Sequence, residues 1–328
     1  MSFDLYADLA GESKCPATAD LPGGLAAGFV DGCTAWFATA EIGRTAATNN
    51  NQRRDFERKK NDARNCYMKQ AVTARLLPEE VAKLLDPRVR IPQPGWLAIE
   101  VSFTLQTPWY SKDDRPFHVL DNPVRKDRVF GVPYMSAASW KGLLRWALGM
   151  TTGLIGPTPI EDKEKRKEAE ATILHLFGNE KAATDEFQRG ALAFYPTWFP
   201  RVGFEVINPH SRKTRAGTQP IYYEVVPARY EKDGAKADTK AALRLLYAPL
   251  PGQAARDHVD PKDALRKLID TIEKLLTVYG FSAKRTAGWG LATIDEWEAR
   301  GGAGSKRGSR DDVTAALAQL LRATEARP

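Results

Sequence analysis

The feature that most constrains the fold is the order in which the hydrophobic periodicity changes along residues 96–297. Alternating apolar residues predict a strand over 96–105, whereas residues 136–148 and 261–280 carry apolar side chains at helical spacing. Further strands are expected, in chain order, at 190–199, 220–228, 242–250 and 289–297. With one middle strand counted as extra, the order is βαββαβ, the split βαβ arrangement of an α+β, ferredoxin-like (RRM-like) domain.

This core also predicts the domain boundaries. Residues 1–95 are expected to form a mostly helical N-terminal region, and 96–298 the core. Residues 299–328 are expected to be a flexible basic linker, "GGAGSKRGSR", and a terminal helix. Within the core, a charged helix is expected over 160–177, and the irregular stretch 106–133 is the place for a thumb-like insertion. Gly149 is expected to end the helix that begins near residue 136.

Charge and composition bound the function. The formal net charge is +7, which permits a polyanionic partner. No apolar run approaches the roughly 18 residues that span a membrane, and three cysteines are too few for a disulfide framework. A cytoplasmic protein without membrane contact is therefore expected. Motifs such as a G-x-S-x-G elbow, a P-loop, H-E-x-x-H or C-x-x-C are not found, so enzymes of those classes find little support. We expect a non-catalytic protein without a metal or other cofactor.

A run of basic residues from Arg53 to Arg64 allows two interpretations. It is either a solvated helix face or loop, which we favour, or an arm that contacts RNA.

The helix expected from Ser136 carries the first candidate anion site. Lys141 and Arg145 are four residues apart and share one helix face, while Ser136 and Ser139 add hydroxyl groups near the N-terminus. Free backbone N–H groups and the helix dipole attract anions at that end. A phosphate would meet two cations there; the alternative is an ordinary surface helix capped by Ser136.

The second candidate is the stretch "FSAKRTAGWG", residues 281–290. Lys284 and Arg285 lie in a turn that also holds Gly288 and Gly290, and successive N–H groups in such a turn can form a concavity for anions. Trp289 either anchors the next strand in the core, which we favour, or stacks on a base.

These segments resemble the CRISPR-associated RAMP superfamily. "YMSAASWKGLLR" is similar to its "P-G-S-S-x-K-G-x-x-R" segment, although Ser136-Ala137 and Ala138 replace the proline-glycine and first serine. "HLFGNE" followed by "GALAFYPTWF" resembles its "LFG…G…F" segment. "FSAKRTAGWG", which lacks the usual first glycine, and "VINPHSRKTRAGTQPIYYEVVP" most resemble the sixth subunit of the type III-B Cmr effector complex. The resemblance runs from about Trp96 to Glu296.

The resemblance implies a subunit of a type III CRISPR effector complex that holds guide CRISPR RNA near its 3′ end and caps the backbone filament, in antiviral defence. Its partners would be the guide, the complementary target RNA and other subunits. The implied RNA contacts are Ser136, Ser139, Lys141, Gly142, Arg145, Lys284, Arg285, Gly288, Trp289 and Gly290. Cations and backbone donors contact phosphates without reading sequence, which suits a protein that leaves recognition to base pairing.

Two alternative functions stay open. One alternative is a repeating backbone subunit whose thumb carries a target-cleaving Asp. Arg125, Lys126 and Arg128 are candidate thumb or target contacts in any RAMP subunit. Paired surface carboxylates are the favoured explanation of the thumb acids. The other alternative is a guide-processing endoribonuclease that uses His210; a structural or RNA contact by His210 and Arg212 is the favoured role.

Overall fold

The chain folds into two units, each assembled from segments that are far apart in the sequence. The computed structural model describes residues 26–73, 82–83, 85, 89, 91, 93–114, 118–128, 131–157, 159–179, 187–209, 213, 217, 220–232 and 234–321. Unit 1 comprises Met1–Leu85, Pro108–Tyr134 and Trp198–Thr239, and unit 2 comprises Asp86–Thr107, Met135–Thr197 and Lys240–Pro328. Both units are therefore discontinuous, whereas the sequence analysis divided the chain into consecutive stretches.

Unit 2 contains an antiparallel sheet in the order β11-β10-β1-β9-β3. Its strands are β1 (Leu97–Leu105), β3 (Leu192–Phe194), β9 (Lys240–Tyr247), β10 (Ala292–Gly301) and β11 (Gly304–Gly308). Helix α5 (Ala137–Thr152) follows β1 in the chain, and α8 (Pro261–Lys274) follows β9. β1 and β3 flank β9, as the split βαβ arrangement requires, so the predicted α+β, ferredoxin-like core is confirmed.

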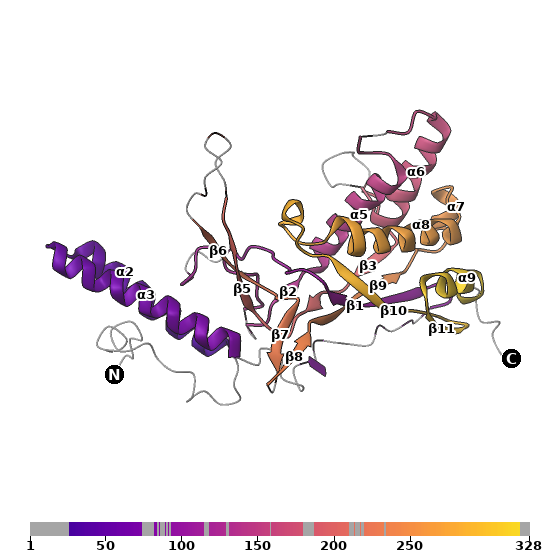
Figure 1. The fold of residues 1–328 in the computed structure, drawn as a ribbon. Helices are drawn as coiled ribbons and strands as arrows, with labels where there is room; N and C mark the ends of the chain where they lie inside the picture. The colour runs from indigo at the N-terminus through magenta and orange to yellow at the C-terminus, as the bar shows by residue number, and fades with distance from the viewer. Residues whose placement is uncertain are drawn as a thin grey trace. The chain divides into compact units, whose positions relative to one another are not determined.

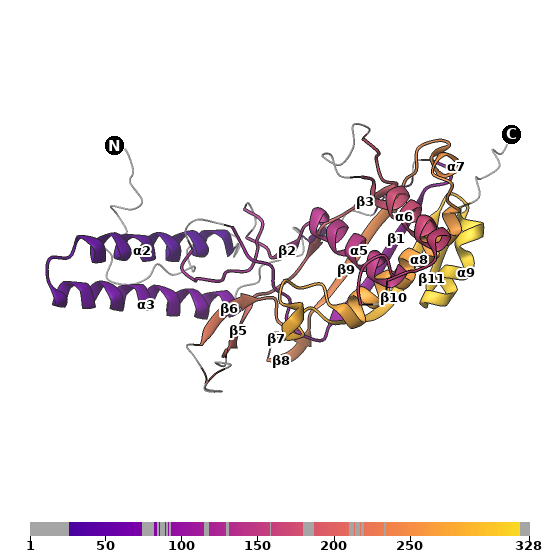
Figure 2. The same ribbon diagram turned by 90° about the horizontal axis from the view of Figure 1, so that it is seen from above.

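The helices of unit 2 cover one face of this sheet. α5 and α8 lie over the strands, and α6 (Lys163–Phe177) lies beside α5 (Figures 1 and 2). α8 buries Leu265, Leu268, Ile269 and Ile272, which are the apolar positions that predicted it. The short α7 (Gln253–Arg256) precedes α8, and α9 (Arg310–Leu320) packs beside β10 and β11.

Three boundaries differ from the sequence predictions. Residues 301–310 are not a flexible linker, because they form β11, which pairs with β10 and places Arg307 Nη2 2.8 Å from Glu298 Oε2. α5 does not end at Gly149 but continues to Thr152, where Gly153 caps it at a φ of 78°. α8 passes at Leu275 into a π-helical turn, η3 (Leu275–Tyr279), instead of staying α-helical to residue 280.

Unit 1 contains a helical hairpin and two short β-hairpins. α2 (Ala26–Ala46) and α3 (Asn50–Thr73) lie side by side, joined by a short turn (Figure 2). The basic run from Arg53 to Arg64 is therefore helical. β5 (Gly203–Ile207) pairs with β6 (Ile221–Val225), and β7 (Arg229–Lys232) pairs with β8 (Ala235–Asp238). The short strands β2 (Tyr134–Met135) and β4 (Thr197–Trp198) lie where the chain passes between units.

A buried ionic cluster holds unit 1 together. Glu224 is fully buried, and its Oε2 lies 2.5 Å from Lys126 Nζ and accepts a hydrogen bond from the Val124 N–H at 3.0 Å. The Tyr67 hydroxyl of α3 donates to the same carboxylate, and Lys126 Nζ donates to the Tyr67 oxygen at 2.9 Å. Burial opposes ionisation of Glu224, but Lys126, His118 and these hydrogen bonds outweigh it and hold the pKa of the carboxyl below its ordinary value.

This cluster predicts a reciprocal mutational effect. Lys126→Met should destabilise the protein by about 3–5 kcal/mol at pH 7, because it leaves a buried carboxylate without its cation. Adding Glu224→Gln should recover much of that loss, since the amide oxygen can still accept from the Val124 N–H and the amide NH2 can donate to the Tyr67 oxygen. Denaturant unfolding of the full chain measures both free energies.

The effect of pH gives a second check. The Lys126→Met change removes the largest influence that opposes burial, so the pKa of Glu224 should rise and the loss of stability should shrink as pH falls from 7 towards 5. In the unmodified protein the lowered pKa has the opposite consequence: the stabilisation is present above the ordinary value of 4.5 and is lost below it. A double variant no more stable than Lys126→Met would contradict this account of the cluster.

Candidate nucleic-acid interface

The two segments predicted to bind phosphate lie side by side in unit 2. Phe281, which opens the glycine-containing loop, stacks on Trp140 of α5 with ring centroids 5.1 Å apart and meets Phe103 of β1 at 5.3 Å. Further along the loop, the Arg285 guanidinium lies 4.1 Å from the ring centroid of Trp146. The loop therefore runs along α5, and the basic residues of both segments belong to one region of the surface.

The N-terminus of α5 is capped without any acidic residue. Ser136 Oγ accepts a hydrogen bond from the Ser139 N–H at 3.1 Å and lies 2.8 Å from Ser139 Oγ. α6 and α8 are instead capped by Asp162 and Asp260. The N–H groups of Ala137 and Ala138 are those that a helix leaves without an intrahelical acceptor. The positive end of the α5 dipole is thus not neutralised by a carboxylate in its first turn.

Lys141 and Gly142 are exposed on this helix, as is Ala138 in its first turn. Lys141 forms no ion pair with any residue that the structure describes, whereas Arg166 and Lys167 of α6 and Arg266 of α8 are paired. A Cβ atom added to Gly142 would meet nothing within 4 Å. Glycine in mid-helix costs about 1 kcal/mol relative to alanine, and no neighbouring atom requires it here. Gly142 therefore leaves the helix backbone open to close approach from outside.

Arg145 has a structural task. Its Nη1 donates to the carbonyl oxygen of Gly178 at 3.1 Å, at the C-terminal end of α6. Only part of its donor capacity is left for a phosphate. The segment after α6 also shows why "LFG…G" occurs in this chain: a Cβ on Gly178 would lie 2.4 Å from Gln188 O, and one on Gly190 2.3 Å from the carbonyl carbon of Phe177. These glycines allow two backbone segments to touch.

The loop is closed by its glycines. Gly280, Gly288 and Gly290 have φ values of 75°, 77° and 83°, and the Phe281 N–H donates to the Gly290 carbonyl at 3.0 Å. A 3₁₀ turn, η4 (Arg285–Ala287), lies at the tip. The N–H groups of Ala287 and Gly288 donate to carbonyls within the loop, so they are not the open anion concavity that the sequence predicted. The loop can offer its side-chain cations instead.

Arg285 and Trp289 differ in their surroundings. The guanidinium of Arg285 stacks on Trp146, and its buried Nη1 has no hydrogen-bond partner among the described residues. Trp289 is half-buried, and its backbone N–H donates to the Lys284 carbonyl at 3.3 Å. Arg285 therefore fastens the loop to α5, while Lys284 and the Trp289 ring stand partly exposed at its surface.

The predicted thumb contacts are not equivalent. Lys126 is only 5% exposed and pairs with Glu224, so its assignment as a thumb or target contact is corrected: a buried ammonium cannot reach RNA. Arg125 lies 3.7 Å from Asp114, and Arg128 is exposed. His210 and Arg212 lie outside the described residues.

A buried histidine, His175, was not singled out by the sequence analysis. Its Nδ1 lies 2.8 Å from Asp257 Oδ2, and its Nε2 lies 2.9 Å from the Tyr247 hydroxyl. Burial opposes ionisation of Asp257, but hydrogen bonds from His175 and Arg256 hold the pKa of the carboxyl below its ordinary value. The side chain is completely buried, so the arrangement ties α6 to β9 and is not open to a substrate. The spacing of charged residues along α6 could not predict this contact, because Asp257 and Tyr247 lie 82 and 72 residues away in the sequence.

Other site classes find no support in the described part of the chain. No three metal-ligating side chains gather there. No helix within it is long and apolar enough to cross a bilayer.

This fold and its sequence define a family. The RAMP superfamily model matches residues 102–293, which is more than half of the chain, and the protein belongs to that superfamily. No curated protein matches the sequence. Among solved structures, a chain of the type III-B Cmr-beta complex bound to cognate target RNA is similar over 90% of this chain and 96% of its own, with 15% identity and a TM-score of 0.50.

A weaker likeness, with a TM-score of 0.40 and 15% identity, is to a chain of the Csm3-Csm4 subcomplex of a type III-A CRISPR-Cas interference complex. It covers 70% of this chain and 98% of the other. The family match shows that this is a RAMP protein, and it does not identify the subunit or its RNA contacts.

The loop geometry predicts unequal effects of two alanine substitutions. Gly288→Ala should cost about 1 kcal/mol, because the new Cβ meets nothing within 4 Å and only the positive φ is unfavourable. Gly290→Ala should cost more, since its Cβ would lie 2.5 Å from the Ser282 nitrogen. Thermal unfolding measures the difference, and equal losses would mean that the loop is not closed as the structure shows.

Proposed function

We propose that this RAMP protein is an RNA-binding structural subunit of a type III CRISPR effector complex. It holds the guide RNA backbone near the 3′ end, caps the backbone filament, and contacts the complementary target RNA and neighbouring subunits. The loop and residues 206–227 resemble the sixth Cmr subunit, which supports a similar position for this protein in the complex. A terminal subunit of this kind occurs once per complex, so subunit stoichiometry of the natively purified assembly tests the position.

Gly142 is the observation that carries the RNA-binding proposal. It sits beside Lys141, which forms no ion pair with any described residue, near the α5 N-terminus, whose first turn has no acidic residue. A phosphate backbone that passes close to the helix would need both the missing side chain and the adjacent ammonium group. Contacts of this kind give affinity without sequence preference, and pairing between guide and target supplies specificity.

We also propose that the protein has no catalytic role. The thumb carboxylates Asp114 and Asp121 lie within 4 Å of arginine side chains, as surface ion pairs do. His175, the histidine with a carboxylate partner, is buried. These surroundings favour a structural protein over the cleaving alternatives.

Two substitutions on α5 test the RNA contact. Gly142→Ala should raise the free energy of unfolding by up to about 1 kcal/mol yet weaken guide-RNA binding, because the added methyl group occupies the path of the RNA. Lys141→Ala should weaken binding and reduce the slope of log K against log salt by about 0.7, the value for one phosphate of a single strand. Filter binding over a salt series gives both quantities.

Lys165→Ala on α6 is the matched control, since it also removes one exposed lysine from a helix of unit 2. It should leave binding and its salt dependence unchanged. If Gly142→Ala stabilises the fold and RNA binds as before, α5 is an ordinary surface helix and the proposal fails.

Incubation with RNA tests the absence of catalysis. The purified protein should leave repeat RNA and guide-paired target RNA intact over hours. Specific scission that His210→Ala abolishes would establish the processing enzyme instead. Target cleavage lost on Asp121→Ala would establish the cleaving backbone subunit.

A further inference from the structure

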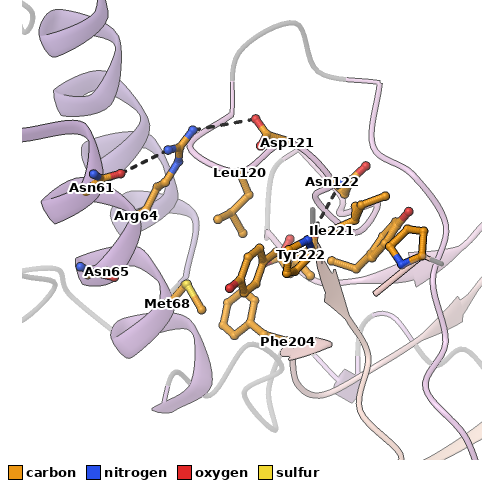
Figure 3. A pocket seen from close by; sticks show the side chains of 14 residues that line it. Asn61, Arg64, Asn65, Met68, Leu120, Asp121, Asn122, Phe204, Ile221 and Tyr222 are labelled. Atoms are coloured by element: carbon orange, nitrogen blue, oxygen red, sulfur yellow. Dashed lines mark hydrogen bonds and ion pairs between the residues drawn. The ribbon is translucent and has the colours of Figure 1, made fainter. Parts of the chain in front are cut away.

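A groove in unit 1 is lined by none of the α5 and loop residues for which RNA contacts are proposed above. It has a volume of about 1000 Å³ and is bounded by α3, by residues 120–122 and by the β5–β6 hairpin. Figure 3 shows Met68 of α3 pointing toward the rings of Tyr222 and Phe204, while Arg64 extends toward Asp121. A volume of this order accommodates a nucleotide-sized ligand.

An exposed aromatic ring forms one wall of the groove. The Tyr222 side chain is 59% exposed, whereas its neighbour Tyr223 is only 6% exposed and belongs to the core. The Tyr222 backbone is fixed, because its carbonyl accepts from Asn122 Nδ2 at 3.0 Å and β6 pairs with β5. A large ring that stays in solvent on a fixed strand is a platform on which a planar group can stack.

Polar residues of α3 line the same groove as this ring. The Asn65 amide is exposed and has no partner among the described residues. Arg64 is held at the rim, since its Nε donates to the Val119 carbonyl at 3.3 Å and its Nη2 lies 3.9 Å from Asp121. An amide presents donors and an acceptor together, which is the pattern of a base edge. A nucleobase on Tyr222 would thus meet hydrogen-bonding groups opposite.

A basic stripe leads along α3 to the groove. Arg54, Arg58, Asn61 and Asn65 are spaced by four, three and four residues and share one helix face. A second, shallower hollow contains the two arginines and shares Asn61 with the groove, so the surface is continuous. α3 carries seven Lys and Arg residues against three Asp and Glu residues. Arg53 and Arg54 have no acidic partner among the described residues.

We infer that α3 and this groove form a second RNA-binding surface, which takes an unpaired nucleotide with its base against Tyr222 and its neighbouring phosphates along Arg54 and Arg58. Single-stranded RNA fits better than a protein partner because the surface combines two arginines with an exposed ring and amides. Arg54 has no acidic partner among the described residues, whereas Arg58 lies 3.1 Å from Asp55 at the exposed surface. The site requires unstacked bases, so duplex RNA should not occupy it. It does not depend on the proposed contacts of α5 and the loop.

A fluorescent base tests the stacking directly. The full chain is titrated with single-stranded RNA oligonucleotides that carry 2-aminopurine at successive positions, and fluorescence and affinity are measured together. Tyr222→Ala should weaken binding about fivefold or more and abolish the 2-aminopurine change at one position. Tyr222→Phe, which keeps the ring, should retain both. Duplex RNA of the same sequence should compete poorly.

The charge of the stripe is tested by Arg54→Ala with Arg58→Ala. The pair should reduce the salt slope by about 1.4, as two lost phosphate contacts would. Arg166→Ala with Lys167→Ala on α6 removes the same charge from another exposed helix and should change nothing. These results are distinguishable from the α5 contact, since Lys141→Ala should leave the 2-aminopurine signal in place.

Unchanged RNA affinity and an unchanged 2-aminopurine signal in Tyr222→Ala would overturn the inference. The same holds if cross-links from residue 222 in the assembled complex go to another protein subunit while RNA binding is unaffected, because the groove would then be a protein contact.

Discussion

The packing of Phe281 against Trp140 and Phe103 fixes the surface on which the proposed function depends. All three rings are almost completely buried, and they belong to the loop, to α5 and to β1. Each aromatic pair adds about 0.5–1.5 kcal/mol to what burial of the rings contributes. The Trp140 indole N–H is satisfied as well, because it donates to Thr197 Oγ1 at 2.9 Å. The stack therefore gives the loop one position along the helix.

This constraint separates two kinds of basic residue. Some complete the fold: Lys126 neutralises Glu224, Arg145 holds the end of α6, and Arg285 stacks on Trp146. Others, such as Lys141 and Arg54, stand exposed without an acidic partner among the described residues. The net charge of +7 says nothing about this division, since a paired cation and an exposed one count equally. An exposed cation without an acidic partner gains an electrostatic interaction when a phosphate binds. The paired cations already have such an interaction within the protein.

Periodicity predicted the core because the sheet and its helices bury one face each. The alternation in β1 and the apolar stripe of α8 follow directly from that geometry. β7, β8 and β11 were missed because they are short, polar hairpin strands whose stability comes from pairing. The sequence predicted which residues of α5 and of the loop could contact phosphate. Only the structure shows that these two segments lie side by side. The partners of Lys126, Arg145 and His175 could not be predicted, because each lies at least 33 residues away in the chain.

The central claim is that RNA lies along α5 and the glycine-containing loop. Photocross-linking of 4-thiouridine-labelled guide RNA in the natively purified complex, followed by mass spectrometry of the adducts, tests it most directly. The account predicts adducts within residues 136–145 and 281–290. If RNA stays bound while adducts fall only on α6, α9 or β11, and both segments remain free, the account is contradicted.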